Sequence, residues 1–127
     1  LASVCMSMAN GSLVDVKFRS EASVCKYVVP KGYGSNPANN ATLIVNDSYR
    51  EHSDLYYAAV NINDSGDIST TSSRAAAIVS TGHDIATAES RCESGLSYIS
   101  GSNIFVRHDI AKPHLIDKRI KNMESIR

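Results

Sequence analysis

The hydrophobic and polar positions of the chain follow two different periods, one typical of helices and one typical of strands. Leu1, Val4, Cys5 and Met8 have the helical spacing i, i+3, i+4 and i+7, and this pattern stops at the Asn-Gly pair of residues 10–11. The sequence therefore predicts a short amphipathic helix at the start of the chain.

Strand patterns cover much of the remaining chain. They are rich in β-branched and aromatic residues and cover residues 13–18, 22–29, 42–45, 56–61, 68–71, 73–80 and 104–106. The turn residues at 64–67 predict a hairpin between the strands on either side. The small apolar run at 73–80 is typical of a strand that is covered on both faces.

Two more helices complete the predicted elements. The first begins after Asp84, a good N-cap residue, and the second begins near Pro113. Their apolar faces consist of Ile85, Ala88, Cys92 and Leu96 in the first and of Ile116, Ile120 and Met123 in the second. Together these elements predict an α+β fold, with a mostly antiparallel sheet and a few packed helices.

Composition narrows the class of protein. The chain has 127 residues, of which 43% are hydrophobic, and a formal net charge of +0, which is typical of a domain with a single core. The balanced charge argues against a nucleic-acid partner, and no segment approaches the ~20 apolar residues of a membrane span. Cys5, Cys25 and Cys92 form no Cys-x-x-Cys pair, so we interpret them as small buried thiols of a cytoplasmic protein.

The first helical pattern begins at Leu1 without an N-cap residue or an initiator methionine. We therefore expect the chain to start inside a longer protein. On this hypothesis residues 1–12 are the end of a preceding domain, and residues 13–127 form the α+β domain.

The first candidate for chemistry is a loop. The strand at 22–29 should stop at Val29, because Pro30 cannot donate to a strand ladder, and the sequence Lys-Gly-Tyr-Gly follows at residues 31–34. Glycines with positive φ can expose backbone N–H groups, and beside Lys31 such groups could bind an anion. The alternative interpretation is a plain turn with a solvated lysine.

The second candidate follows the last predicted strand, where Arg107, His108 and Asp109 stand in a row. A guanidinium binds phosphate or carboxylate through two parallel hydrogen bonds, and a neighbouring aspartate can fix its orientation. The alternative is a surface ion pair, which contributes little to stability.

These features occur in one order: the strand ending in Pro-Lys-Gly-Tyr-Gly, the Ser-Arg that opens the run at 73–80, the helix capped by Asp84, and Arg-His-Asp-Ile at 107–110. In this combination the chain resembles, over essentially its whole length, the C-terminal region of phosphoribosylamine–glycine ligases, which are ATP-grasp enzymes of purine biosynthesis. The resemblance implies that the substrate is bound by Lys31, Gly32, Tyr33, Gly34, Arg74, Arg107, His108 and Asp109. It also shows two departures, because His108 replaces a usual Arg or Lys and Ala111 replaces a glycine that would suit positive φ.

The resemblance further implies the reaction of phosphoribosylamine, glycine and ATP to glycinamide ribonucleotide, ADP and phosphate. ATP and Mg²⁺ (or Mn²⁺) would be held mainly by an ATP-grasp part before Leu1. This chain would then supply the substrate side of the cleft, with no catalytic or metal-binding residue of its own, and would be inactive alone.

Two alternatives remain open. One is a free-standing anion-binding module without catalysis. The other is an interaction piece of a larger assembly, which an exposed apolar patch on the first helix would favour.

Overall fold

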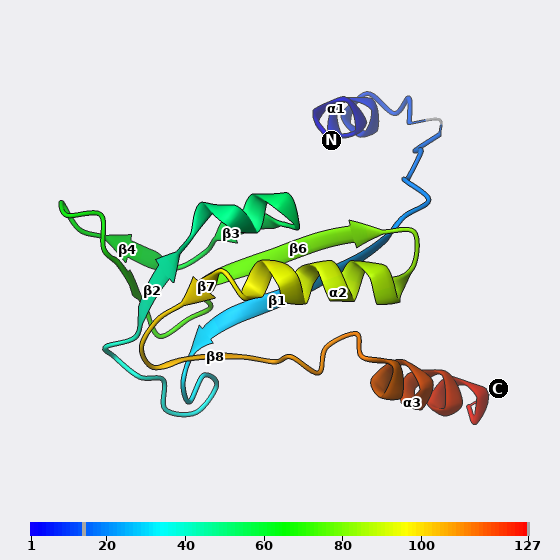
Figure 1. The fold of residues 1–127 in the computed structure, drawn as a ribbon. Helices are drawn as coiled ribbons and strands as arrows, with labels where there is room; N and C mark the ends of the chain where they lie inside the picture. Colours follow the sequence, from blue (N-terminus) through cyan, green and yellow to red (C-terminus); the bar gives the residue numbers. More distant parts are fainter. Residues whose placement is uncertain (14, 127) are drawn as a thin grey trace.

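The centre of the molecule is a helix packed on one face of an antiparallel sheet (Figure 1). The computed structural model describes residues 1–13 and 15–126. The elements of these residues, in chain order, are α1 (Ala2–Ala9), β1 (Ala22–Pro30), β2 (Thr42–Val45), a 3-10 helix (Asp47–Glu51), β3 (Asp54–Tyr57), β4 (Val60–Ile62), β5 (Ile68–Thr70), β6 (Ala76–Gly82), α2 (Ile85–Leu96), β7 (Ile99–Ser100), β8 (Ile104–Val106) and α3 (Pro113–Glu124). The strands form two antiparallel sheets of order β3-β6-β1-β8 and β4-β5-β2-β7. This architecture confirms the predicted α+β class.

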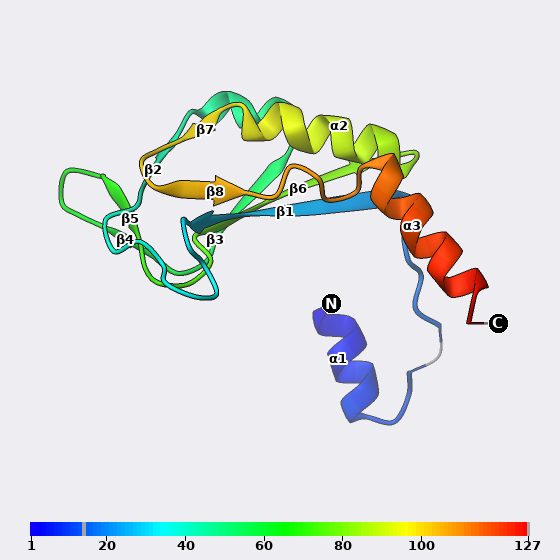
Figure 2. The same cartoon turned by 90° about the horizontal axis from the view of Figure 1, so that it is seen from below.

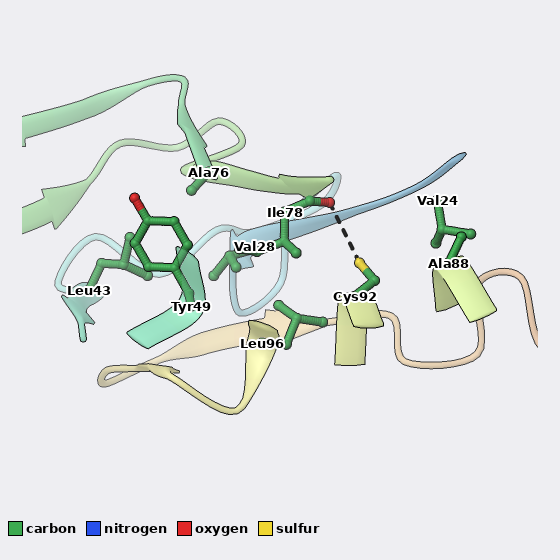
Figure 3. Close-up of a cluster of buried hydrophobic side chains, with 9 residues drawn as sticks. All are labelled: Val24, Val28, Leu43, Tyr49, Ala76, Ile78, Ala88, Cys92 and Leu96. Carbon is green, nitrogen blue, oxygen red and sulfur yellow. Dashed lines mark hydrogen bonds between the residues drawn. The ribbon is translucent and has the colours of Figure 1, made fainter. Parts of the chain in front are cut away.

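The core lies between α2 and the sheet that contains β1. Alternation along β1 sends Val24 and Val28 to the side of α2, where both are buried beside Ile78 of β6. Figure 3 shows this cluster, which consists of Val24, Val28, Leu43, Tyr49, Ala76, Ile78, Ala88, Cys92 and Leu96. Residues from both halves of the chain therefore meet in one core.

Small residues let α2 lie close to the sheet. A Cβ atom on Gly82 would lie 2.7 Å from the backbone nitrogen of Ala88, and one on Gly95 would overlap the hydroxyl of Ser53. At the helix start, the carboxylate of Asp84 accepts a 2.7 Å hydrogen bond from the backbone N–H of Thr87, which confirms the predicted N-cap.

Some predicted strands are wrong or displaced. Residues 13 and 15–18 form no strand, since their alternating pattern finds no neighbouring strand to pair with; Val14 of that prediction lies outside the described residues. The strand expected at 56–61 is two strands, β3 and β4, in different sheets. Between them the N–H groups of Ala58 and Ala59 donate to the carbonyls of Ala75 and Arg74, so the two segments stay hydrogen-bonded just beyond the β3–β6 ladder.

The run predicted at 73–80 enters the sheet only at Ala76, and the 3-10 helix and β7 were not predicted. In contrast, the hairpin of β4 and β5 and the strands β2 and β8 confirm their predictions. The strand β1 also forms, but the predicted end at Val29 is wrong by one residue, because Pro30 still pairs with Ile104 of β8.

The two terminal helices form as predicted but remain exposed. Figures 1 and 2 show α1 apart from the sheets, and Leu1 at its start is 96% exposed. On α3, Ile120 and Met123 of the predicted apolar face are likewise exposed. The expectation of three buried thiols is wrong for Cys5 and Cys25, which are exposed, and holds for Cys92.

The loop after β1 depends on two glycines with positive φ, Gly32 at 74° and Gly34 at 90°. The carbonyl of Gly32 accepts backbone hydrogen bonds from Ser35 and Asn36, and a Cβ atom on Gly32 would overlap the carbonyl oxygen of Asn36. Around the position of a Cβ on Gly34 there is open space. Substitution of Gly34 therefore tests backbone strain alone, whereas substitution of Gly32 tests backbone strain together with steric overlap.

We expect Gly34→Ala to lower the free energy of unfolding by about 1 to 2 kcal/mol, because an alanine must adopt the left-handed conformation. Gly32→Ala should lower it clearly more, since the loop must also move away from the new methyl group. Urea denaturation of both variants measures the difference. Equal losses would show that the contact with Asn36 does not constrain the loop.

Candidate functional site

An open cleft of about 700 Å³ borders the face of β1 that points away from α2. In Figure 2, α2 lies on one side of the β1–β6 layer. The cleft residues of β1 alternate with the buried Val24, Lys26 and Val28 and therefore face the other side. The lining residues are Cys25, Tyr27, Val29, Lys31, Gly32, Tyr33, Arg74, Phe105, Arg107 and Ile110. They come from β1, from the loop after it, from the turn before β6, from β8 and from the segment after β8.

The charge of the cleft is positive. Lys31, Arg74 and Arg107 contribute three cations, while none of the described lining residues is acidic. The guanidinium carbon of Arg74 lies 4.9 Å from the centre of the Tyr27 ring, a cation–π contact that holds Arg74 over the floor of the cleft. Cations above an apolar, aromatic floor suit a ligand that has an anionic group and a less polar body.

Arg107 is oriented by Asp109. Its Nε donates to Oδ1 of Asp109 at 2.9 Å, and its Nη2 donates to Oδ2 at 2.5 Å. This hydrogen bonding raises the pKa of Arg107 and holds the pKa of Asp109 below its usual value. A guanidinium has five N–H donors, so three remain on Nη1 and Nη2 after Asp109 has taken two. Arg107 can therefore keep this ion pair and still bind an anion.

Cys25 is exposed overall, but partial desolvation by its neighbours on the cleft floor raises the pKa of its thiol. The neutral thiol is a poor nucleophile. The raised pKa therefore gives no support for Cys25 as a nucleophile of this cleft.

The structure brings five of the eight predicted site residues to this cleft: Lys31, Gly32, Tyr33, Arg74 and Arg107. The loop reaches it because the N–H of Lys31 donates to the carbonyl of Asn103, just before β8. Of the other three, Gly34 lies further along the loop, and Asp109 acts on Arg107. His108 lies elsewhere, with its ring beside Glu93 of α2.

Ala111 keeps the backbone conformation expected of a glycine. Its φ is 64°, and its side chain packs partly against the core. The departure from glycine therefore leaves the turn intact, at the cost of some backbone strain.

Sequence reasoning missed a buried charge cluster on the α2 side of the sheet. Lys26 of β1 is only 1% exposed, and its ammonium donates to Glu89 at 2.7 Å, to Glu93 at 2.5 Å and to the carbonyl of His108 at 2.9 Å. Lys112 lies 2.7 Å from the same oxygen of Glu89. One signal was present: Lys26 lies between Val24 and Val28 on the buried side of the strand, where a lysine needs anionic partners.

The pKa values of this cluster follow from its pairing. Burial disfavours the charge on Lys26, but its hydrogen bonds with Glu89 and Glu93 outweigh this effect and raise its pKa. Burial likewise opposes ionisation of both glutamates, yet the bonds from Lys112 and Lys26 to Glu89, and from Lys26 and His108 to Glu93, lower their pKa values. The cluster is therefore ionised at neutral pH.

Two negative findings apply to the described residues. No three histidine, cysteine or acidic side chains lie close enough in that part of the chain to hold a metal ion. Nor does any helix of that part have the length and apolar character to cross a membrane.

Comparison of the sequence with known proteins shows the family of this chain. The sequence profile described as "Phosphoribosylglycinamide synthetase, C domain" matches residues 23–113. The phosphoribosylamine–glycine ligase of Methanocella arvoryzae is 45% identical over 126 residues, and that of Methanocaldococcus jannaschii is 41% identical over 128; each alignment covers 98% of this chain and 28% of the relative. The chain thus belongs to the phosphoribosylglycinamide synthetase C-domain family and spans about 28% of the length of these relatives.

A solved structure supports the fold. The crystal structure of phosphoribosylamine–glycine ligase from Thermotoga maritima matches 86% of this chain and 27% of its own length, with a TM-score of 0.69 and 18% identity. At that identity the match confirms the fold alone.

Because of this charge cluster, we expect the free energy of unfolding to fall at acidic pH. The folded-state pKa values of Glu89 and Glu93 lie below the unfolded value of about 4.3, so the unfolded chain binds more protons near that pH. The stabilisation is present above about pH 4.3 and is lost as the pH falls through the lowered folded values. Each carboxyl adds a slope of up to about 1.4 kcal/mol per pH unit.

We define the neutral-cluster variant as Lys26→Met, Glu89→Gln and Glu93→Gln combined. Urea denaturation between pH 5 and about pH 3 should give a shallower dependence of the unfolding free energy on pH in this variant than in the wild type. Glu124→Gln, an exposed substitution on α3, serves as the control and should keep the wild-type slope. Identical slopes in all three proteins would show that the cluster does not contribute to acid unfolding.

Proposed function

We propose that this chain is the C-terminal domain of a phosphoribosylamine–glycine ligase. Such an enzyme joins phosphoribosylamine to glycine with ATP and forms glycinamide ribonucleotide, ADP and phosphate. Family membership and two relatives of that name at 45% and 41% identity support the proposal. The same observations favour a ligase over a free-standing anion-binding module.

The observation that carries the proposal for the site is the cationic cleft on β1. Phosphoribosylamine has one phosphate, and Arg107 offers it two or more N–H donors while Asp109 holds the guanidinium in place. Lys31 and Arg74 line the same cleft and add positive charge. Tyr27 and Tyr33 supply apolar surface for the ribose.

In this role the domain positions a substrate and performs no covalent step. Binding the phosphate at a fixed point converts a reaction between free molecules into one between held groups, which lowers the entropic part of the barrier. Gly34, His108 and Asp109 would act around this point rather than within the cleft lining.

The described cleft does not fit Mg²⁺, because that ion prefers oxygen ligands and the lining residues carry no carboxylate. We therefore assign ATP and Mg²⁺ (or Mn²⁺) to an ATP-grasp part of the full-length ligase and derive no step through them here. That part would be the main partner of this domain, in a cytoplasmic enzyme.

Arg107 provides the direct test. In the full-length ligase, Arg107→Ala should raise the KM for phosphoribosylamine by about tenfold to a hundredfold and leave the KM values for ATP and glycine nearly unchanged, because only the phosphate loses a charge-assisted contact. Arg107→Lys should recover part of the loss, since an ammonium keeps the charge but not the fork.

The matched control is Arg50→Ala, which removes another exposed arginine that is paired with an aspartate, Asp47, away from the cleft. Steady-state kinetics with each substrate varied in turn gives the three KM values. If the KM for phosphoribosylamine is the same in Arg107→Ala and Arg50→Ala, Arg107 does not bind this substrate.

A further prediction concerns the chain of residues 1–127 alone. It should neither bind MgATP tightly nor form glycinamide ribonucleotide, because the described residues offer no carboxylate site for the metal at the cleft. Calorimetry with MgATP and a product assay check this, with the full-length ligase as the positive control. Turnover by the chain alone would contradict the proposal that ATP and Mg²⁺ bind to another part of the full-length ligase.

A further inference from the structure

The segment that carries Arg107 has little regular structure of its own. The strand β8 ends at Val106, and residues 107–112 run through turns to the start of α3. Within the segment, the N–H of Ile110 donates to the carbonyl of Arg107 at 3.4 Å and that of Lys112 to Asp109 at 3.1 Å. Turns of this kind do not by themselves fix a side chain that is more than half exposed, as that of Arg107 is.

The buried charge cluster supplies the missing constraint from the other side of the sheet. The ammonium of Lys26 donates to the carbonyl of His108, the residue between Arg107 and Asp109. The ring nitrogen Nδ1 of His108 lies 2.9 Å from Glu93, and Lys112 at the other end of the segment lies 2.7 Å from Glu89. Three contacts therefore join this segment to β1 and α2.

The burial of Lys26 makes its contact specific. An ammonium has three N–H donors, and Lys26 has three acceptors: Glu89, Glu93 and the carbonyl of His108. A shift of the segment would leave one donor of a fully buried cation without a partner, which is costly in a site closed to water. A solvated lysine would impose no such penalty.

Successive side chains of β8 and the residues after it point to opposite faces of the sheet, so cleft residues alternate with residues that contact the core and α2. Phe105 and Arg107 line the cleft, whereas Val106 packs against the core and His108 contacts α2. Fixing the main chain at His108 therefore fixes where the side chain of Arg107 emerges on the far side.

We propose that Lys26, together with Glu89 and Glu93, positions Arg107 for the substrate phosphate by holding the main chain of residues 107–112 from the α2 side of the sheet. These three are positioning residues, since they act through Arg107 and lie outside the cleft. The inference rests on the proposed function, because it assumes that Arg107 binds that phosphate.

The test uses the full-length ligase and two variants. The first variant, Lys26→Met, removes the ammonium but leaves Glu89 with Lys112 alone and Glu93 with His108 alone. The neutral-cluster variant is therefore the second, because it leaves none of the three charged groups without its partner. We expect the KM for phosphoribosylamine to rise about tenfold in the neutral-cluster variant, with the KM values for ATP and glycine within about twofold of wild type. Calorimetry should show weaker binding of ribose 5-phosphate to this variant, in parallel with the rise in KM. The affinity for MgATP should stay the same.

A double-mutant cycle separates positioning from a general structural effect. In an Arg107→Ala background the neutral-cluster substitutions should raise the KM for phosphoribosylamine no further, because their effect passes through Arg107. The control is Arg91→Met, which removes an exposed cation of α2 that donates to the carbonyl of Thr81, outside the cluster. It should leave all three KM values unchanged.

Each outcome decides between the proposals. If Arg107→Ala raises the KM for phosphoribosylamine but the neutral-cluster variant does not, or raises all three KM values together, the positioning role is wrong and the proposed site stands. The positioning role is also wrong if the neutral-cluster substitutions raise the KM for phosphoribosylamine equally in the wild type and in the Arg107→Ala background. If Arg107→Ala itself changes nothing, the proposed phosphate site is wrong, and the positioning role with it.

Discussion

The burial of one cation, Lys26, constrains much of this structure. A lysine ammonium can be buried only when its charge and its three donors are matched, and the matching groups here come from α2 and from the segment after β8. The helix must therefore lie along β1 with Glu89 and Glu93 facing the sheet. The last part of the chain must return to the same point. Apolar packing of Val28, Cys92 and Leu96 provides the area of contact between the layers, and the ion cluster fixes their register.

The strand β1 serves both faces of the sheet. One set of alternate residues contributes the core and the buried lysine, and the other set contributes the floor of the cationic cleft. This arrangement couples the stability of the domain to the shape of the cleft, since the same backbone carries both. The described lining of the cleft carries cations and no carboxylate, whereas the α2 side of the same sheet carries the paired charges of Lys26, Glu89 and Glu93.

The exposed terminal helices are a different case. Both form where the sequence predicts them, but neither contributes to the core described here. Helical periodicity predicts an apolar face and says nothing of what covers it. The exposed apolar side chains of α1, Leu1 and Met8 among them, keep an interaction role for this helix open.

The sequence alone determined the local features: the periods of the helices and most strands, the cap at Asp84 and the row of Arg107, His108 and Asp109. These depend on neighbours a few residues apart. The tertiary structure alone decided which partners meet. It paired Lys26 with carboxylates 63 and 67 residues away, brought Lys31, Arg74 and Arg107 to one cleft, and left residues 13 and 15–18 without a partner strand. A period of two tells which side of a strand is buried, but the identity of the facing element depends on long-range packing, which no local pattern encodes.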